Sequence, residues 1–515
     1  MKNFRQLSLL ILLVLTSFMS NGQGTVTFPK NINSMKMTAT GVAVVATDDA
    51  LYGIDKNGKE IWKKPKLKKI DARKIEVLEG SELILVHGGL MQGIMIINVM
   101  DGGYVGDNDG VIYGARVIHG TNQVWIIKQY NAIDVWDISN NKKLYRFDKV
   151  SLPYGLTSSN QTASQPKNFI GVQPVTYTNE KSAILHLGVG QLGEYNLLTG
   201  SPIWEFDWSP YKVKKPKDGK GDLPSSLNKG FAIMKLDNES NTLYFPFRNM
   251  LIAVDSKTGK AKWDVKANKF SQVKDIFVTD EGIVIRTLSG IELVDKNSGN
   301  TKWDKPIKIK GTDGSLLVNS GGSFYVVSKK SIEKIDIANR KSITLVDKIK
   351  FEGGDSFSGL ELINGTVILY GKQNVVGVNK ESGKIVFSTY YKAPGASVMD
   401  IAQNAVSAGL AMAATQNSMR VNAQSGSKTY YQYTPAMRNS GGSRTTDAEN
   451  SLFISTKFKD ADANGFGIAK VDKETGKTMK KIVIGVRDPI YVIDENNGLI
   501  FYKSDKNELT IKSIL

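Results

Sequence analysis

Few residues of this sequence could take part in familiar catalytic chemistry. The 515-residue chain contains no cysteine, which excludes disulfides, thiolate metal sites and cysteine nucleophiles. Its three histidines, His87, His119 and His186, lie far apart in the sequence and indicate neither a metal centre nor a catalytic triad. We interpret each of them as an ordinary strand or loop residue.

One acidic segment has the spacing of the first half of a calcium-binding loop. Asp460, Asp462 and Asn464 place oxygen ligands at alternate positions, and Gly465 could form the turn that follows. Val471 stands where a bidentate glutamate would be needed, so the segment is not an EF-hand. A polar hairpin tip is the favoured interpretation, with a metal site as the alternative.

Basic residues form the second chemically informative group. The chain has 67 Lys and Arg against 50 Asp and Glu, and lysines gather in the runs Lys56–Lys69 and Lys212–Lys220. No nucleic-acid recognition motif or basic helix accompanies them. The charge therefore favours anionic glycans, lipid headgroups or acidic proteins as partners, and ordinary solvated loops are the alternative.

The second run lies in an insertion with aromatic neighbours. Insertions between repeats usually form loops on one face, where binding surfaces are common. We predict that this loop contributes to a partner-binding surface. Its candidate residues are Lys212, Lys214, Lys215, Lys217, Lys220, Trp208 and Tyr211.

The first 22 residues have the pattern of a secretory signal peptide. Lys2 and Arg5 precede the apolar run Leu7–Phe18, and Ser20–Gly22 offers small residues before a cleavage point at Gln23. No later run is apolar enough to predict a transmembrane helix. We expect a single region, 23–515, with a net charge of +15, exported to the periplasm or to the cell surface or medium.

A repeated motif extends along the rest of the chain. Its clearest copy, Ala253–Trp263, has an apolar strand, an Asp, two polar residues, Thr-Gly and then a Trp four residues after the glycine. Ten copies of varying strength begin at residues 55, 98, 137, 196, 255, 295, 336, 379, 422 and 472. Most of the gaps are close to the length of one four-stranded propeller blade.

The content of each unit favours strands over helices. Short β-branched runs such as Gly282–Ile285 and Thr366–Leu369 are bounded by turn residues. The Ala-rich segment Asp400–Gln416 resembles a helix in isolation, but it aligns with Asp275–Leu288 of another unit, and we expect strands there. The sequence thus predicts an all-β propeller of about eight to eleven four-stranded blades, with one large ring favoured over two.

Each recurring position of the motif has a physical role within the repeat. The Asp or Asn side chain can bond the turn backbone, and the glycine supplies a positive φ. The aromatic ring can cover the gap between neighbouring blades. Because an active site needs one special residue rather than ten equivalent ones, we assign the aspartates to turns. The structural docking residues are Trp62, Trp204, Trp263, Trp303, Phe387, Gly200, Gly259, Gly299, Gly383 and Gly476.

The two ends of the repeat region suggest how the ring closes. Three strand-like runs follow the last motif, at 490–492, 499–502 and 509–511, with no fourth. Thr25–Phe28 is a strand-like run without a blade of its own. Pairing of these N- and C-terminal strands would complete one composite blade.

These motifs resemble the PQQ-like β-propeller repeat of quinoprotein alcohol dehydrogenases and of BamB-like proteins. Ala253–Trp263 matches the tryptophan docking motif of that family at every fixed position, and the resemblance covers essentially residues 25–515. It implies the fold more than the chemistry. The enzymatic branch typically has a vicinal Cys-Cys pair and a Glu, Asn and Asp around calcium, and neither set is recognisable here. The cysteine that anchors BamB-like lipoproteins is absent as well.

We therefore expect an exported, non-catalytic propeller that serves as a protein- or polyanion-binding scaffold in the cell envelope. No cofactor is predicted. A quinone (PQQ)- or metal-dependent oxidoreductase, which would use PQQ or calcium, is the main alternative, and a glycan-binding propeller is another. Expected partners are an envelope or extracellular protein, or an anionic glycan or lipid headgroup, with the chain acting as a monomer or as part of a complex.

Overall fold

The computed structural model describes most of the chain after the predicted signal peptide. The described residues are 24–515 except 79–80, 89–93, 108–111, 119–120, 129–131, 149–175, 180, 189–190, 212–233, 248, 265–269, 272, 310–315, 321, 329–330, 356–358, 395–444, 448–450 and 488. The signal peptide, the segment Asp400–Gln416 and the repeat copy at residue 422 lie outside them.

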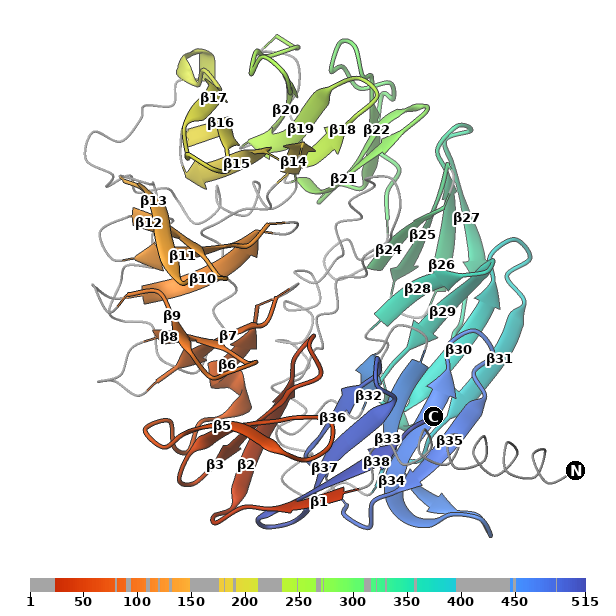
Figure 1. Ribbon diagram of the computed structural model, residues 1–515. Helices are drawn as coiled ribbons and strands as arrows, with labels where there is room; N and C mark the ends of the chain where they lie inside the picture. Colours follow the sequence, from red (N-terminus) through yellow and green to blue (C-terminus); the bar gives the residue numbers. More distant parts are fainter. Residues whose placement is uncertain are drawn as a thin grey trace, which may run out of the picture.

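The described residues form ten antiparallel sheets arranged in a ring (Figure 1). We number these sheets as blades in chain order. Blades 1 to 3 contain β2 (Ile32–Met37), β3 (Ala43–Thr47), β4 (Leu51–Ile54) and β5 (Glu60–Lys64); β6 (Ile75–Val77), β7 (Leu83–His87), β8 (Ile94–Asn98) and β9 (Tyr104–Val105); and β10 (Ile112–Ile118), β11 (Gln123–Lys128), β12 (Ala132–Asp137) and β13 (Lys142–Phe147). Blades 4 to 6 contain β14 (Thr176–Asn179), β15 (Ser182–Gly188), β16 (Gln191–Asn196) and β17 (Pro202–Glu205); β18 (Lys235–Asp237), β19 (Thr242–Phe247) and β20 (Met250–Asp255); and β21 (Val273–Thr279), β22 (Gly282–Thr287) and β23 (Ile291–Val294).

The remaining blades complete the ring. Blades 7 and 8 contain β24 (Leu316–Ser320), β25 (Ser323–Ser328), β26 (Ser331–Asp336) and β27 (Lys341–Val346); and β28 (Gly359–Ile363), β29 (Thr366–Tyr370), β30 (Asn374–Asn379) and β31 (Ile385–Tyr390). Blades 9 and 10 contain β32 (Thr445–Asp447), β33 (Ser451–Lys459), β34 (Asn464–Asp472) and β35 (Thr478–Val483); and β36 (Tyr491–Asp494), β37 (Leu499–Asp505), β38 (Glu508–Ser513) and β1 (Gly24–Thr27). Among the described residues, the only helical segments are the short turns η1 (Ala72–Lys74), η2 (Ser209–Tyr211) and η4 (Glu352–Gly354).

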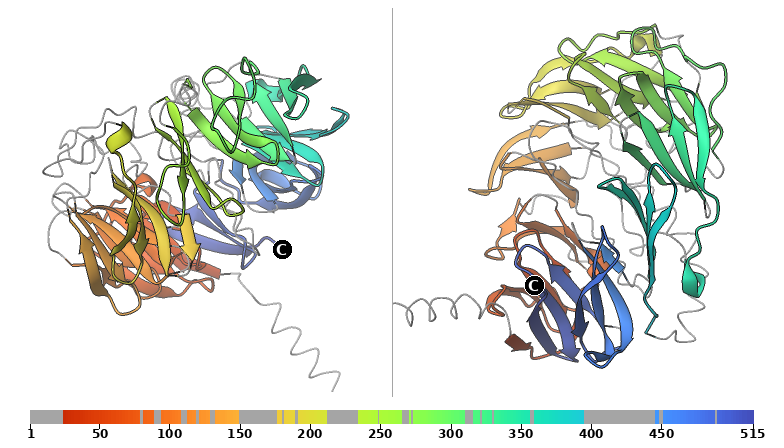
Figure 2. Two further views of the ribbon diagram at one scale, coloured as in Figure 1. Left: turned by 90° about the horizontal axis from the view of Figure 1, so that it is seen from above. Right: turned by 90° about the vertical axis from the view of Figure 1, so that its right-hand side faces the viewer.

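In a typical blade the first strand lies toward the ring interior and the fourth on the rim, as blades 3, 7 and 8 show in Figure 1. Figure 2 shows the blades following one another around the ring from two other directions. Blades 5 and 6 have three regular strands each. Their outer strands are reduced to isolated bridges. Blade 5 has the bridge of Val254 with Ala261, and blade 6 has those of Val294 with Thr301 and Ile291 with Ile307.

The hydrophobic core consists of clusters between neighbouring blades. Consecutive residues of a second strand belong to opposite clusters: Val44 packs toward blade 2, whereas Val45 packs toward blade 10. The same division separates Val124 from Trp125 in blade 3. Because both faces of each sheet are buried, these strands are continuous apolar runs without polar alternation.

Blade 10 is the composite blade that closes the ring. Strand β1 pairs antiparallel with β38, with Thr25 opposite Thr510 and Val26 opposite Leu509. Phe28 and Tyr52 of blade 1 and Phe501 of blade 10 lie in one buried cluster. The predicted all-β propeller, its blade range and its closure by the N- and C-terminal strands are confirmed.

Candidate functional site: the blade seams and the lysine-rich rim

The seam between blades 4 and 5 shows how one blade contacts the next. Trp204 of β17 donates its Nε1–H to the carbonyl of Ser256 at 3.0 Å and to Glu194 Oε2 at 2.9 Å. Its ring covers Gly259, where an added Cβ would overlap the indole. Gly259 also has φ +71°, so the turn requires glycine both for its backbone and for close approach of the ring.

Equivalent contacts occur at other seams. In each, the accepting carbonyl belongs to the residue directly after the Asp or Asn of the next blade's turn. The donors and acceptors are Trp62 Nε1 to Val99 O at 2.6 Å, Tyr145 Oη to Leu197 O at 2.9 Å and Trp263 Nε1 to Lys296 O at 3.0 Å. The ring–glycine contacts are Trp62 with Gly102, Tyr145 with Gly200 and Phe387 with Gly476.

Three seams use different residues for the same purpose. Trp303 is half-buried, and the guanidinium of Arg340 lies 5.9 Å from its ring centroid in a turn that lacks glycine. Leu345, rather than an aromatic residue, covers Gly383. At the closing seam, Val26 of β1 covers Gly58. The terminal strand therefore contacts blade 1 in the way that other outer strands contact their neighbours.

A β-bulge precedes the covering residue in several outer strands. In β17 the partner of Glu194 is Trp204, whereas the partner of Tyr195 is Pro202, so Ile203 is the extra residue. The corresponding extra residues in β5, β13, β31 and β35 are Ile61, Leu144, Val386 and Met479. A bulge bends the strand and re-aims its side chains. It places the next residue over the neighbouring blade and leaves Ile203, Val386 and Met479 between 55% and 58% exposed.

The repeated aspartates are engaged in their own turns. Asp255 Oδ1 accepts the N–H groups of Lys257 and Thr258 at 3.1 and 2.9 Å and the hydroxyl of Thr258 at 2.9 Å. Asp295 makes the same bonds, chiefly with Ser298. The bonds from Ser298 hold the pKa of Asp295 below its ordinary value, so the carboxylate stays ionised.

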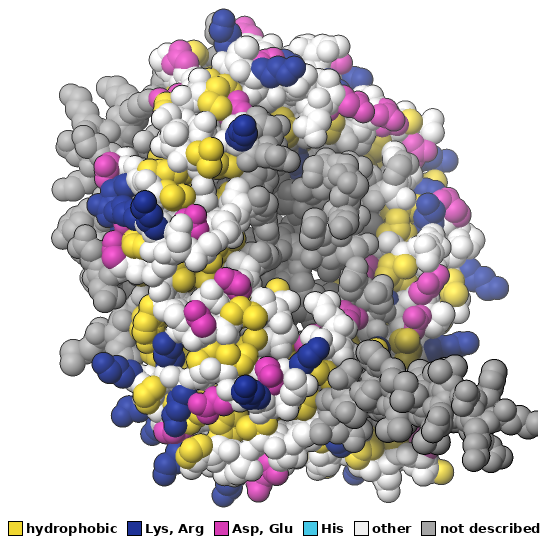
Figure 3. All heavy atoms as spheres, in the orientation of Figure 1, with side chains coloured by type: hydrophobic (Ala, Val, Ile, Leu, Met, Phe, Trp, Pro, Cys, Tyr) yellow, Lys and Arg dark blue, Asp and Glu magenta, His cyan; other side chains and the backbone are white. Residues whose placement is uncertain are grey.

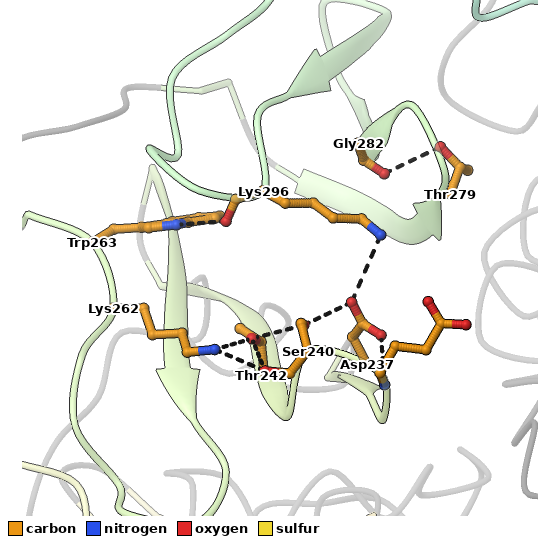
Figure 4. A network of polar contacts seen from close by, with 9 residues as sticks. Asp237, Ser240, Thr242, Lys262, Trp263, Thr279, Gly282 and Lys296 are labelled. Carbon is orange, nitrogen blue, oxygen red and sulfur yellow. Dashed lines mark hydrogen bonds and ion pairs between the residues drawn. The ribbon is translucent and has the colours of Figure 1, made fainter.

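Figure 4 shows a polar network at the seam of blades 5 and 6. Asp237 Oδ2 accepts the Ser240 hydroxyl at 2.8 Å and lies 3.7 Å from Lys296 Nζ of the next blade. Lys262 Nζ donates to the Ser240 carbonyl at 2.8 Å and to Thr242 Oγ1 at 2.7 Å. These cations are directed onto the protein itself, so the network connects two blades that lack regular outer strands.

Charged pairs also lie at the inner strands, where the sequence pattern gave no signal. Asp275 of β21 and Arg286 of β22 are cross-strand partners, with Oδ2 and Nε 2.5 Å apart and both side chains largely buried. Desolvation raises the pKa of Asp275, with Arg286 and Lys235 acting in the opposite direction. The pair is a structural ion pair because each charge has a partner where water is scarce.

A second pair of this kind spans two blades. Lys473, which is only 1% exposed, places Nζ 2.9 Å from Oε1 and 3.1 Å from Oε2 of Glu361. Glu361 also accepts the hydroxyl of Tyr370 at 3.1 Å. The lysine follows the turn aspartate of blade 9 and reaches the first strand of blade 8.

The candidate calcium ligands occupy a hairpin tip between β33 and β34. Lys481 Nζ lies 2.9 Å from Asp460 Oδ2 and 3.0 Å from Asp462 Oδ1. This arrangement does not fit a calcium ion, because an ammonium group already takes the place between the two carboxylates. Asn464 begins β34 and is exposed. Among the described residues, no three His, Asp or Glu side chains gather as a metal site would require.

The predicted partner loop is only partly described. Its five lysines lie outside the described residues. Trp208 and Tyr211 are 3% and 6% exposed, and their rings pack with Phe206, Phe245 and Phe247. These two aromatic side chains lie in the core between blades 4 and 5 rather than at a contact surface, because the outer strand of blade 4 continues into this cluster.

The histidines are distributed over separate elements. His87 ends β7 and His186 lies in β15, while His119 is outside the described residues. No helix of the described chain has the length and apolar character needed to cross a bilayer.

The first lysine run forms a basic strip on the rim of blade 1, along β5 and the segments beside it. Exposed cationic side chains occur at both ends of the strand and along it: Lys56, Lys59, Lys63, Lys66, Lys68 and Lys69. Figure 3 shows dark blue side chains gathered on the lower left of the molecule, where Figure 1 draws β5.

Comparison with known proteins gives no family assignment. No family model and no curated protein matches the chain. Similar solved structures include BamB from Moraxella catarrhalis, at 12% identity over 67% of this chain and 96% of that chain, with a TM-score of 0.35. Dihydro-heme d1 dehydrogenase NirN in complex with DHE is 10% identical over 79% and 74% of the two chains, with a TM-score of 0.37. The computationally designed Ika8 protein is 12% identical over 72% and 99%, with a TM-score of 0.34. These low scores bear on neither function nor partner.

Proposed function

We propose that the protein is a non-catalytic binding scaffold. The observation that supports this most directly is the use of the repeated polar residues. Asp255 and Asp295 are engaged in turns, Trp204 and Trp263 bond the next blade, and exposed lysines remain on the rim. A rigid closed ring with charged outer strands suits partner binding, because its surface is held in a fixed geometry.

The proposal includes the cell location and the family branch. The signal-peptide pattern of residues 1–22 supports export and a mature chain from residue 23. The Ala253–Trp263 motif supports membership of the non-enzymatic branch of PQQ-like propellers. The partner would be an envelope or extracellular protein or a polyanion, bound in part by the lysines of the 212–220 loop.

The oxidoreductase alternative makes a separate prediction. A quinone-dependent enzyme should take up PQQ with calcium in a fixed ratio, change its absorbance and reduce an artificial electron acceptor on turnover. We expect the purified mature protein to show neither uptake nor turnover. Stoichiometric uptake with dye reduction would overturn the scaffold proposal.

The loop lysines are tested by affinity capture from envelope extracts. A variant with Lys212, Lys214, Lys215, Lys217 and Lys220 changed to Glu should lose partners that the native protein retains. Full retention of every partner would contradict a role for this loop. A variant with Lys142, Lys341, Lys348, Lys350 and Lys384 changed to Glu controls for the change in net charge, because it also reverses five charges and these lysines are exposed on other blades.

A further inference from the structure

We propose that the basic strip on the rim of blade 1 binds a linear acidic polysaccharide, whose carboxylate or sulfate groups pair with its lysines. This deepens the proposed scaffold function by naming a site and a class of partner. The strip consists of β5, the turn before it and the segment up to Lys69. Its fourteen residues contain seven lysines and a single acidic residue, Glu60.

Several lysine charges of the strip are not neutralised by an ion pair within the described part of the protein. Lys56, Lys59, Lys68 and Lys69 are exposed, and none has an ion-pair partner among the described residues. Lys63 lies 3.5 Å from Asp49 in an exposed pair, which contributes little to stability. Elsewhere, the buried Lys473 is paired with the largely buried carboxylate of Glu361.

The nearby acidic groups are largely engaged in local bonds. Asp55 Oδ1 accepts the backbone N–H groups of Asn57 and Lys59 at 2.8 Å each. Asp49 accepts the hydroxyls of Thr47 and Tyr52 at 2.6 and 3.1 Å. These bonds fix the two carboxylates but leave their charge, and the seven lysines of the strip outnumber them and Glu60, so a polyanion would feel a net positive field over roughly 8–10 Å at physiological salt.

The shape of the strip favours a linear ligand. The cations lie in the turn before β5, along the strand and in the segment after it. Five strand residues alone extend about 17 Å. At one end the turn glycine Gly58 rests on Val26 of the closing blade, and at the other Lys64 Nζ lies 4.3 Å from the ring centroid of Tyr104 in blade 2. The strip thus reaches both seams of blade 1 on a rigid base.

The exposed apolar surface beside the strip suits a sugar better than a bilayer. Trp62 and Leu67 of the strip are buried, and Ile61 packs partly against the same cluster, so the strip offers no fully protruding apolar side chain for insertion between lipids. Tyr104 is 46% exposed next to Lys64. An aromatic ring with a polar tip can pack against the C–H face of a sugar while neighbouring lysines bind its acidic groups.

A protein strand is a poorer fit on this edge. Outer strands attract other strands through their unpaired backbone groups, and lysines and bulges prevent this pairing. Strand β5 has both features. Ile61 is an extra residue that bulges opposite Gly53 and Ile54, and Lys63 and Lys64 follow it in the strand. Recognition through side-chain charge is therefore favoured over addition of a strand.

The test uses the mature protein, residues 23–515, and measures its affinity for a size-defined heparin oligosaccharide and for polygalacturonate. We expect the K56Q/K59Q/K68Q/K69Q variant to bind about tenfold more weakly, which corresponds to about 1.4 kcal/mol shared among four exposed pairs. The matched variant K341Q/K348Q/K350Q/K384Q should change affinity less than about twofold, because screened charges on distant blades contribute little. All eight side chains are exposed, so folding should be unaffected, and circular dichroism would verify it.

Tyr104 separates sugar packing from charge alone. Y104A should lower the affinity for both glycans, whereas Y104F should retain it, because only the aromatic ring is required. Neutral dextran should not bind. An equal loss of glycan affinity in both lysine variants would contradict the proposed binding site. So would the absence of glycan binding, or binding of phosphatidylglycerol vesicles or polyglutamate that is as tight as or tighter than that of the glycans.

These outcomes differ from those for the proposed scaffold function. Absence of glycan binding, with retained capture of a partner that depends on the 212–220 loop, would overturn the strip alone. Quinone-dependent turnover would overturn the scaffold proposal, while the comparison of lysine variants would still decide whether the strip binds glycans.

Discussion

Gly259 meets two separate physical demands. Its φ of +71° is strained for any L-residue with a side chain, and the indole of Trp204 leaves no room for a Cβ. Gly365 meets only the first, with φ +79° and open space around it. Comparing the two glycines therefore separates backbone strain from the contact between blades.

We expect Gly365→Ala to lower the free energy of unfolding by about 1–2 kcal/mol through backbone strain. Gly259→Ala should lose about 1–3 kcal/mol more, because the indole has to move. Urea denaturation monitored by tryptophan fluorescence would measure the free energy of unfolding of both variants. Equal losses would mean that the ring contact at Gly259 contributes no packing constraint.

The hydrogen bond of a docking indole can be tested apart from its ring. Trp263 donates to the Lys296 carbonyl at 3.0 Å, whereas Phe387 covers its glycine without a donor. Trp263→Phe should therefore cost only about 1 kcal/mol, the net value of one hydrogen bond. Trp263→Ala should cost about 3–5 kcal/mol through the cavity it leaves. A phenylalanine variant as unstable as the alanine variant would show that the bond, not the ring, stabilises this seam.

At the scale of elements, β1 carries the closure of the ring. It supplies the fourth strand of blade 10 by pairing with β38, and Val26 covers Gly58 of blade 1. Without β1, the edge of β38 and part of a buried cluster would be exposed. Exposed strand edges favour association between chains.

A chain that begins at residue 30 should melt at a lower temperature and aggregate more than one that begins at residue 23. Adding a synthetic peptide of residues 23–29 should raise its melting temperature, because an extended peptide can add to a free strand edge. A scrambled peptide serves as the control. Unchanged melting after truncation would contradict the closing role of β1.

At the scale of the whole molecule, the ring brings charges from different blades together. Glu76 of β6 has an exposed side chain on an inner strand, yet desolvation by the surrounding protein raises its pKa to about 7, with Lys36 of β2 acting in the opposite direction. Desolvation lowers the pKa of Lys36, and the charges of Asp71 and Glu76 act in the opposite direction. The inner-strand charges are therefore coupled across blades.

This coupling predicts a dependence of stability on pH. A carboxyl group with a raised pKa in the folded state stabilises the fold below its unfolded pKa of 4.5, and this stability is lost as pH rises toward about 7. Glu76→Gln should flatten this part of the melting-temperature profile, while Glu60→Gln on the exposed rim should not. Because Glu76 reaches water, the change should be well below that of a fully buried group. If the melting-temperature profiles of the native protein and of Glu76→Gln coincide, Glu76 does not contribute to the pH dependence of stability.

Most of the fold could be read from local patterns. The spacing of Asp255, Gly259 and Trp263 encodes a turn whose bonds lie within a few residues, and β-branched runs encode strands buried on both faces. The candidate site was harder to predict from the sequence. Trp208 and Tyr211 resemble exposed contact residues beside a basic loop, but packing against rings of blade 5 buries them.

The sequence by itself determined the blade, its turns and the strands that close the ring, because each depends on residues close in sequence or on an unmatched terminal strand. Only the tertiary structure decided which charges meet: Lys473 with Glu361, Arg286 with Asp275 beside Lys235, and Lys481 with the two aspartates of the supposed calcium loop. The pair of Lys473 and Glu361 depends on which blade follows which, whereas the other two depend on strand register and on how a bulge turns an outer strand. No local spacing records that geometry, since their partners lie up to 112 residues apart.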